Sequence, residues 1–235
     1  VHICQTSRPR VVIAERDFGP VCLMAGRFLS EAPAFLAASD LHQTGGTFRP
    51  PSLDASATAV LQFTSGSTGL QKGVVLSHGA ILANMRSFGE AIQPRPDDKV
   101  VSWLPLYHDM GLIGTTLGTF SLSIPTFLMS PTDFTRDPVR WLWAIHQFRA
   151  TVSVGNNSAF GRLARMCRIS PRRFERHRTY GDGNPLDLSC LRIMMNGSEP
   201  VTVQAMEAFQ REFGPFGLRR EALSPVYGLA EMALA

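Results

Sequence analysis

The sequence predicts an α/β fold with a largely parallel sheet flanked by helices. Six short β-like runs alternate with segments of helical period, a pattern typical of parallel α/β proteins. The chain has 235 residues, of which 44% are hydrophobic and 18% charged. It can therefore bury a sizeable core as one or two domains, and this composition is not that of a disordered chain.

The six strands are expected in the runs TAVLQF, KVVSWLP, IPTFLM, TVSV, CLRIMM and SPVY, in chain order. Before the first run, residues 43–57 are rich in Gly, Pro, Ser and Thr, as a connecting loop is. We therefore predict that residues 1–57 are the end of a preceding subdomain with a linker. Residues 58–235 are predicted to form an α/β subdomain.

Helices are expected between the strands, each with one apolar face. The first follows Ser77, the second starts at Asp137-Pro138, and Thr202 can cap the third. Their inner faces are formed by Ile81, Met85, Phe88 and Ile92, by Trp141, Ile145 and Phe148, and by Met206, Phe209 and Phe213, respectively.

A basic segment extends from Arg162 to Arg178, with seven arginines and one glutamate in a chain of net charge +4. Such a patch could bind phosphates or an acidic partner. No aromatic side chains alternate with the arginines, so we expect no nucleic-acid partner. We favour an amphipathic helix with solvated arginines, whose buried stripe is Phe160, Leu163, Ala164 and Cys167.

The segment from Met110 to Thr132 has no charged residue and is long enough to span a bilayer. Its many Gly, Ser and Thr residues dilute it, and Pro125 divides it into a helix-like piece and the strand-like IPTFLM. We interpret it as buried core and expect no membrane span.

The cysteines are Cys4, Cys22, Cys167 and Cys190, which form neither a CxxC metal pattern nor a small disulfide scaffold. The first fifteen residues lack the features of a signal peptide. The cysteine pattern favours a reducing, cytoplasmic location.

The stretch TSGSTGLQKG combines glycines, which let backbone N–H groups converge, with hydroxyls and the cation of Lys72. This combination suits phosphates. It is not a Walker loop, because Gln71 stands where that loop needs glycine and Gly73 follows the lysine. The candidate phosphate-binding residues are Thr64, Ser65, Gly66, Ser67, Thr68, Gly69, Lys72 and Gly73.

This stretch resembles the phosphate loop of the adenylate-forming ligase superfamily, [ST]SG[ST]TGxPKG, with Gln71 in place of proline. SWLPLYHDMGLIG, Ser102 to Gly114, is similar to a second block of that superfamily, and its YHDMG is typical of the fatty-acyl-AMP ligase branch. The resemblance implies that His108 flanks the acyl and phosphate sites. It also implies that the chain is part of the large N-terminal domain of such a ligase, with residues 58–235 as an ATP- and acyl-binding subdomain truncated at its carboxyl end.

NGSEPV and YGLAE resemble a third block, which binds the nucleotide. By this resemblance, Gly197, Ser198 and Glu199 line the adenine pocket, Tyr227 stacks on the base, and Glu231 binds the Mg²⁺ that bridges ATP phosphates. An aromatic face suits a purine, and a carboxylate suits a hard cation. The remaining cofactor-binding candidates in these two runs are Asn196, Gly228, Leu229 and Ala230. Ala230 replaces a common threonine, as is typical of fatty-acyl-AMP ligases.

GNNSAF, Gly155 to Phe160, resembles a segment in which a proline precedes the asparagine that matches Asn157, whereas this chain has Asn156 there. We assign it to the substrate side.

The resemblance implies that a fatty acid and ATP form acyl-AMP and pyrophosphate, with Lys72, His108 and Glu231 as the catalytic residues. Mg²⁺ is the implied metal, and the acyl group then passes to the phosphopantetheine of an acyl carrier protein. The family's ribose-binding aspartate, hinge and catalytic lysine lie beyond Ala235, so we expect little or no turnover from these 235 residues alone.

Two alternatives remain open at this stage. An acyl-CoA or aryl-CoA synthetase would use coenzyme A as the acceptor, and an insertion downstream of YGLAE would mark the fatty-acyl-AMP ligases instead. A non-catalytic module would bind nucleotide or a partner through the arginine-rich helix. Retention of Lys72, Glu199 and Glu231 speaks against that second alternative.

Overall fold

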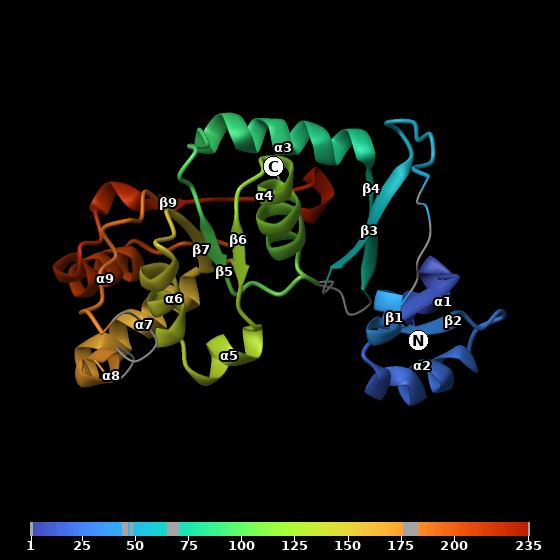
Figure 1. Ribbon diagram of the computed structural model, residues 1–235, viewed down its shortest axis with the longest axis horizontal. Helices are drawn as coiled ribbons and strands as arrows, with labels where there is room; N and C mark the ends of the chain where they lie inside the picture. Colours follow the sequence, from blue (N-terminus) through green and yellow to red (C-terminus); the bar gives the residue numbers. More distant parts are fainter. Residues whose placement is uncertain (1, 44–46, 48, 65–70, 176–182, 235) are drawn as a thin grey trace. The chain divides into compact units, whose positions relative to one another are not determined.

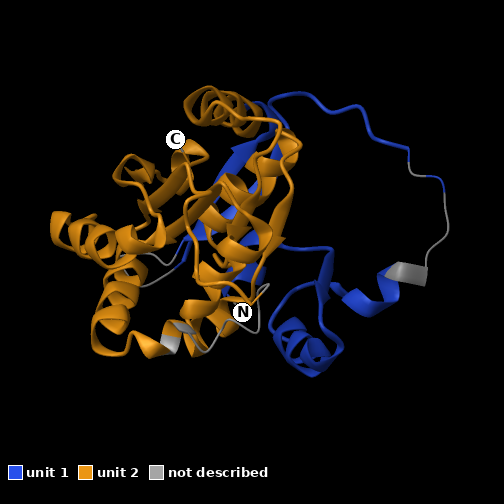
Figure 2. Ribbon diagram, turned by 60° about the vertical axis from the view of Figure 1, so that its left-hand side comes forward, with its two compact units in different colours: residues 1–79 blue, residues 80–235 orange. Residues whose placement is uncertain are grey.

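The computed structural model describes residues 2–43, 47, 49–64, 71–175 and 183–234. The chain divides into two compact units, residues 1–79 and 80–235, which are coloured separately in Figure 2. The two units divide after residue 79, because the strand that begins at Thr58 pairs within the first unit. The assignment of functional domains stays a prediction.

The first unit contains two small sheets. Strand β1 (Val11–Ala14) pairs in parallel with β2 (Ala34–Ala37), and β3 (Thr58–Thr64) pairs antiparallel with β4 (Lys72–Ser77). The helices are α1 (His2–Ser7) and α2 (Gly19–Gly26), with 3₁₀ turns at Arg16–Phe18 and Ala38–Gln43. Of the six predicted strands, only β3 lies in this unit.

The second unit is built on a five-stranded parallel sheet with the order β6-β5-β7-β8-β9. Its strands confirm the five predicted runs after residue 80 and are shorter than or displaced from those runs by a few residues. They are β5 (Val100–Ser102), β6 (Thr126–Leu128), β7 (Val152–Asn156), β8 (Ile193–Gly197) and β9 (Leu223–Pro225).

Helices cover both faces of this sheet. Figure 1 shows α7 and α9 together on one side and α3 and α4 on the other. The helices are α3 (His78–Ile92), α4 (Gly118–Ser121), α5 (Pro131–Arg136), α6 (Val139–Phe148), α7 (Asn157–Ile169), α8 (Arg172–Glu175) and α9 (Val203–Phe213). The remaining helical segments are a π-helix over Met110–Leu117 and 3₁₀ turns over Gly214–Phe216, Arg220–Ala222 and Ala230–Met232.

The main core lies between the sheet and α6, α7 and α9. Trp141, Phe160 and Phe209 are fully buried there. A smaller core lies on the other face of the sheet, under α3 and α4. It contains Val100 and Val152 from the strands and Ile92 from the end of α3. Alternation of strand side chains between two faces produces these two layers.

The predicted helices are confirmed. Helix α3 buries Ile81, Met85 and Ile92, and α6 begins directly after Pro138 with Trp141 and Ile145 fully buried. The Thr202 hydroxyl accepts a hydrogen bond from the Ala205 N–H at 3.3 Å and so caps α9 as predicted.

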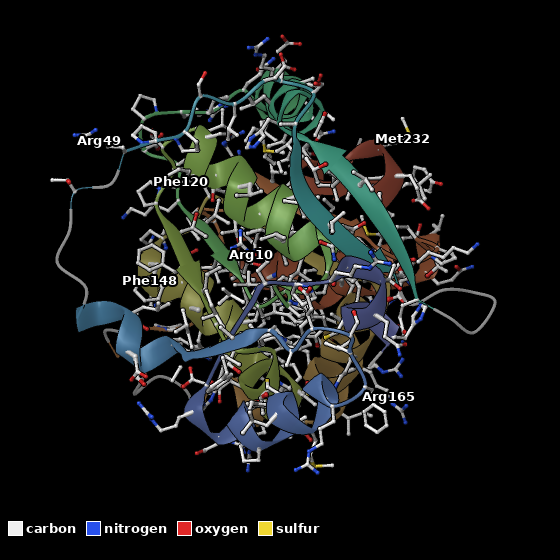
Figure 3. The ribbon with its side chains drawn as sticks, turned by 90° about the vertical axis from the view of Figure 1, so that its right-hand side faces the viewer. Arg10, Arg49, Phe120, Phe148, Arg165 and Met232 are labelled. Atoms are coloured by element: carbon white, nitrogen blue, oxygen red, sulfur yellow. The ribbon has the colours of Figure 1, made fainter. Side chains whose placement is uncertain are left out.

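Helix α7 confirms the amphipathic interpretation of the basic segment. Its predicted stripe is buried, whereas Arg162, Arg165 and Arg168 are exposed, and Figure 3 labels Arg165 on this outward face. The part of the basic segment at 176–178 lies outside the described residues. In the ranges that the structure describes, no helix is long and apolar enough to cross a membrane.

Candidate active site

The predicted site residues of the second unit follow the carboxyl ends of neighbouring strands. His108 comes after β5, Glu199 after β8 and Tyr227 after β9. The order of the sheet reverses between β5 and β7, since β6 lies on one side of β5 and all later strands on the other. In open parallel sheets, ligands bind outside the carboxyl ends near such a reversal. This edge is therefore the candidate active site on the grounds of topology.

Close contacts join the loops at this edge. The Ser198 hydroxyl donates to the Met110 sulfur at 3.5 Å, which connects the loop after β8 to the loop after β5. The Val226 N–H donates to the Asn196 carbonyl at 2.8 Å, which connects the ends of β8 and β9. Leu234 lies so close to Gly114 that a Cβ on this glycine would be 2.4 Å from the Leu234 Cδ2. The segments containing YHDMG, NGSEPV and YGLAE thus share one edge of the sheet.

His108 is paired with the neighbouring carboxylate. Its Nδ1 lies 2.6 Å from Asp109 Oδ1, and the Asp109 side chain also accepts from the Met110 N–H at 2.7 Å, which caps the π-helix. The hydrogen bond to Asp109 raises the pKa of His108, and the same bond lowers the pKa of Asp109. Half of the imidazole is exposed, so this histidine can carry a positive charge at the edge of the sheet.

Glu199 contacts the start of α7. One carboxylate oxygen accepts from the Ser158 N–H, and the other accepts from the Ser158 hydroxyl at 3.0 Å. The amino end of a helix carries partial positive charge and unpaired N–H groups, which favour a carboxylate at this position. The predicted role of Glu199 in an adenine pocket stays a prediction.

Asn196 is fully buried at the end of β8 and does not face solvent. Its Nδ2 donates to Asn157 Oδ1 at 3.3 Å. The next residue, Gly197, lies against β9, and a Cβ there would be 2.9 Å from the Val226 carbonyl oxygen. Ser198 then adopts a left-handed conformation, with φ of 67°, which bends the chain toward Glu199.

Tyr227 exposes 78% of its surface just after β9. The following turn is tight, because a Cβ on Gly228 would be 2.0 Å from the Leu234 carbonyl oxygen. Leu229 is exposed and Ala230 is buried, so their predicted contribution to a nucleotide site would come through the backbone of this turn.

Glu231 is exposed on the 3₁₀ turn after YGLA. Among the described residues, no group of three or more His, Cys, Asp or Glu side chains converges as a metal site. A single exposed carboxylate fits Mg²⁺, which is commonly held by one or two carboxylates, water and the phosphates of a substrate.

The first unit holds the described part of the predicted phosphate loop. Strand pairing sets Thr64 opposite Lys72 where β3 and β4 meet the loop, and it sets Phe63 opposite Gly73. Lys72 is exposed and Thr64 is half-buried. Ser65, Gly66, Ser67, Thr68 and Gly69 lie outside the described residues. The structure therefore brings Thr64 and Lys72 together in one unit, and His108, Glu199 and Tyr227 to one sheet edge in the other.

The sequence reasoning did not single out Ser158 or Asp109, which contact two of the predicted site residues. Ser158 lies in the GNNSAF segment, whose assignment to the substrate side stays a prediction. Ser158 was detectable as a hydroxyl in the first turn of a helix that directly follows a strand. Asp109 was detectable as a carboxylate next to a candidate histidine. Neither pattern alone indicates which side chain Ser158 or Asp109 contacts.

Comparisons with known proteins agree with this topology. The family model described as AMP-binding enzyme matches residues 1–235. The medium-chain-fatty-acid–[acyl-carrier-protein] ligase JamA of Moorena producens is 37% identical over 187 residues, which cover 80% of this chain and 30% of JamA. The long-chain-fatty-acid–AMP ligase FadD32 of Mycobacterium marinum is 37% identical over 213 residues, covering 88% of this chain and 32% of FadD32.

Among solved structures, the fatty acyl-adenylate ligase from L. pneumophila in complex with acyl adenylate and pyrophosphate superposes with a TM-score of 0.80. It is 33% identical in sequence, and the match covers 98% of this chain and 38% of that one. The chain thus spans about a third of the length of the curated relatives it matches.

Proposed function

Because the chain belongs to the AMP-binding enzyme family, we propose that it is part of a ligase that activates a fatty acid with ATP and transfers the acyl group to a carrier. In the first step a carboxylate oxygen of the fatty acid attacks the α-phosphorus of ATP. The bond between the α-phosphorus and the bridging oxygen breaks, and acyl-AMP and pyrophosphate form. A carboxylate is already a nucleophile, so the step needs no activated serine or cysteine.

The observation that carries this proposal is the meeting of three loops at one sheet edge, where Met110, Ser198 and Val226 join the segments that contain His108, Glu199 and Tyr227. Tyr227 offers an open ring on which an adenine can stack. The pair with Asp109 raises the pKa of His108, and in its protonated form this imidazole can balance the charge of the reacting carboxylate and phosphate. Catalysis here is positioning and charge neutralisation.

Lys72 is assigned to the phosphates of ATP on the basis of its motif, together with Thr64, Gly73 and the loop residues between them. Glu231 would hold Mg²⁺, which when bound offsets charge on the leaving pyrophosphate. The acceptor is proposed to be the phosphopantetheine thiol of an acyl carrier protein. An acyl carrier protein is the partner that the name of the relative JamA states. Coenzyme A is the alternative acceptor.

A cytoplasmic location is part of the proposal and is supported by four free cysteines, Cys4, Cys22, Cys167 and Cys190. A role in lipid metabolism, or in polyketide or lipopeptide biosynthesis, would follow from the proposed substrate and acceptor.

Titration of the chain with Mg²⁺-ATP tests the phosphate role of Lys72. We expect Lys72→Ala to weaken ATP binding by roughly tenfold or more, because an ammonium–phosphate contact is a charge-assisted hydrogen bond. The sequence contains one other lysine, Lys99, which precedes β5 at the opposite edge of the sheet. Lys99→Ala removes the same charge and is the matched control. Equal affinity of the Lys72 variant and the wild type would remove Lys72 from the site.

The complete ligase that contains this chain tests the reaction and the acceptor. We expect fatty-acid-dependent exchange of pyrophosphate into ATP, followed by acyl transfer to an acyl carrier protein. Transfer to coenzyme A alone would favour the acyl-CoA synthetase alternative, and absence of exchange would contradict the proposed reaction.

A further inference from the structure

Two sets of polar contacts join the start of α7 to the segment that follows β8. We call the five residues involved the α7 brace: Asn157, Ser158, Asn196, Glu199 and Thr202. The proposed function makes no use of these contacts. They connect the segment next to β7, where the order of the sheet reverses, to the segment predicted to line a nucleotide pocket.

The first set occupies the carboxylate of Glu199. Both of its oxygens accept from Ser158, one from the N–H and one from the hydroxyl at 3.0 Å. The neighbouring N–H, that of Ala159, donates to Asn156 Oδ1 at 3.1 Å. The amino end of α7 therefore already binds an anionic side chain of its own protein.

The second set centres on the side-chain amide of Asn157. Its Oδ1 accepts from Asn196 Nδ2 at 3.3 Å and from the Thr202 N–H at 3.1 Å. Its Nδ2 donates to the Thr202 hydroxyl at 3.2 Å. Asn157 thus holds both the last part of β8 and the N-cap residue of α9.

The two sets enclose the strained part of the segment. Ser198 has a positive φ of 67°, a conformation that most residues avoid, and it lies between the contacts of Asn196 and those of Glu199. A residue keeps such a conformation only when its surroundings hold it. Gly197 also lies against Val226, which directly precedes Tyr227, so movement of this segment would reach the proposed base-stacking residue.

We propose that Asn157 and Ser158 are positioning residues of the adenylation site, and that Glu199 acts through Ser158 instead of touching the nucleotide. The brace fixes the backbone of Gly197 and Ser198 and, through Gly197, the start of the segment that carries Tyr227. This inference rests on the proposed function for its ligand. The contacts within the brace stand independently of that ligand.

A double-mutant cycle on Ser158 and Glu199 distinguishes positioning from direct contact. The readout is the Kd of a hydrolysis-resistant acyl-adenylate analogue, measured by calorimetry on the chain. Ser158→Ala is expected to weaken binding roughly tenfold, the effect of one hydrogen bond to a charged group. Glu199→Ala is expected to weaken it at least as much, because it removes the contacts with both the N–H and the hydroxyl of Ser158. The double variant is expected to bind within about twofold of Glu199→Ala, because loss of the carboxylate already removes the contact with the Ser158 hydroxyl.

Two conservative variants test rescue. Ser158→Thr keeps a hydroxyl and the N–H, and Glu199→Gln keeps an acceptor oxygen, so both are expected to retain most of the affinity. Thr135→Ala is the control for loss of a hydroxyl in the first turns of a helix, since Thr135 donates only to the Pro131 carbonyl at 2.9 Å within α5. It is expected to bind as the wild type does.

Hydrogen–deuterium exchange of the ligand-free chain gives a readout without nucleotide. Asn157→Ala and Ser158→Ala are expected to speed exchange in residues 197–202 while the strands β5 and β7 stay protected. A loss of protection throughout the second unit would instead mean that the variants simply unfold it, and would overturn the positioning role.

Additive losses of affinity in the double variant would also overturn the inference, because they would show that Glu199 binds the nucleotide directly. If neither the wild-type chain nor the complete ligase that contains it binds the analogue, the proposed function fails. The exchange of residues 197–202 alone then decides whether the brace holds that segment.

Discussion

Gly197 lies where the ends of β8 and β9 come closest. A Cβ at this position would be 2.8 Å from the Val226 Cγ2 and 2.9 Å from its carbonyl oxygen, which belongs to the backbone and has no side-chain freedom. Gly161, in the interior of α7, has no atom within 4 Å of the corresponding position. The two glycines thus differ in the space around them.

We expect Gly197→Ala to lower the free energy of unfolding by about 1–3 kcal/mol, as overpacking of a tight contact does. Gly161→Ala is expected to raise it by about 0.5–1 kcal/mol, because alanine favours the helix over the unfolded chain. Urea denaturation followed by circular dichroism measures both changes. A Gly197 variant as stable as the Gly161 variant would show that β8 and β9 do not approach each other this closely.

At the scale of elements, the buried ion pair of Asp98 and Arg192 connects β5, β8 and α3 at the amino edge of the sheet. Asp98 precedes β5, Arg192 precedes β8, and the Arg192 guanidinium also donates to the Ile92 carbonyl at the end of α3 at 2.8 Å. Asp98 is 2% exposed and accepts a further hydrogen bond from the Thr151 hydroxyl at 2.6 Å. This edge is opposite the candidate active site.

Burial by itself would raise the pKa of Asp98. Hydrogen bonds from Arg192, Thr151 and the Arg95 N–H outweigh it and lower the pKa from 3.8 to about 2. The stability that this carboxylate contributes is therefore present above pH 3.8 and is lost as the pH falls toward 2, with a magnitude of about 2 kcal/mol.

We expect Asp98→Asn to destabilise the protein by about 3 kcal/mol at pH 7, since it leaves a largely buried guanidinium without its charge partner. The variant is also expected to lose less stability than the wild type between pH 5 and pH 2.5. Urea unfolding at the two pH values measures both effects. Asp133→Asn, at an exposed pair with Arg140, is the control and is expected to change stability by about 0.5 kcal/mol or less. Parallel pH profiles for the wild type and Asp98→Asn would contradict the assignment.

Sequence patterns predicted the strands and helices best where the same pattern recurred along the chain. Alternation of short apolar runs predicted the five parallel strands, and the apolar faces around Trp141 and Phe209 predicted α6 and α9. The helix at Met110 was predicted as a helix-like piece but not as a π-helix. Its hydroxyls donate to carbonyls five residues earlier, as from Thr115 to Met110 at 3.0 Å, and no simple periodicity indicates that pattern.

The strands β1, β2 and β4 were not predicted. They are four to six residues long, and only two of their described residues, Ala37 and Leu76, are fully buried. Their sequences place apolar residues next to one another, as in Val11–Ala14, and so lack the polar–apolar alternation that predicts a half-buried strand.

At the scale of the whole molecule, the buried apolar residues are unevenly divided between the two units. In the described part of residues 1–79 they are Ala37 and Leu76, whereas the main core of residues 80–235 contains three tryptophans and five phenylalanines within its wider set of buried side chains. A pair of parallel strands such as β1 and β2 is marginal in stability without a packed face.

We expect hydrogen exchange to report this division. Amides of β1 and β2 should exchange much faster than those of β7 and β8, which lie inside the five-stranded sheet and pack against α6, α7 and α9. Mass spectrometry of the intact chain over a time course measures the difference, with the edge strand β6 as an intermediate reference. Equal protection of β1 and β7 would show that apolar burial does not set local stability here.

The sequence by itself determined the fold class, the five parallel strands, the family and the candidate residues Lys72, His108, Glu199 and Tyr227, because hydrophobic periodicity and ordered motifs are local properties of the chain. Only the tertiary structure decided that β5 and β7 are neighbours at the reversal of the sheet, and that Glu199 is held by Ser158, 41 residues away in the chain. Strand order and side-chain pairing arise from packing between distant segments, and local sequence patterns carry no information about which distant groups meet.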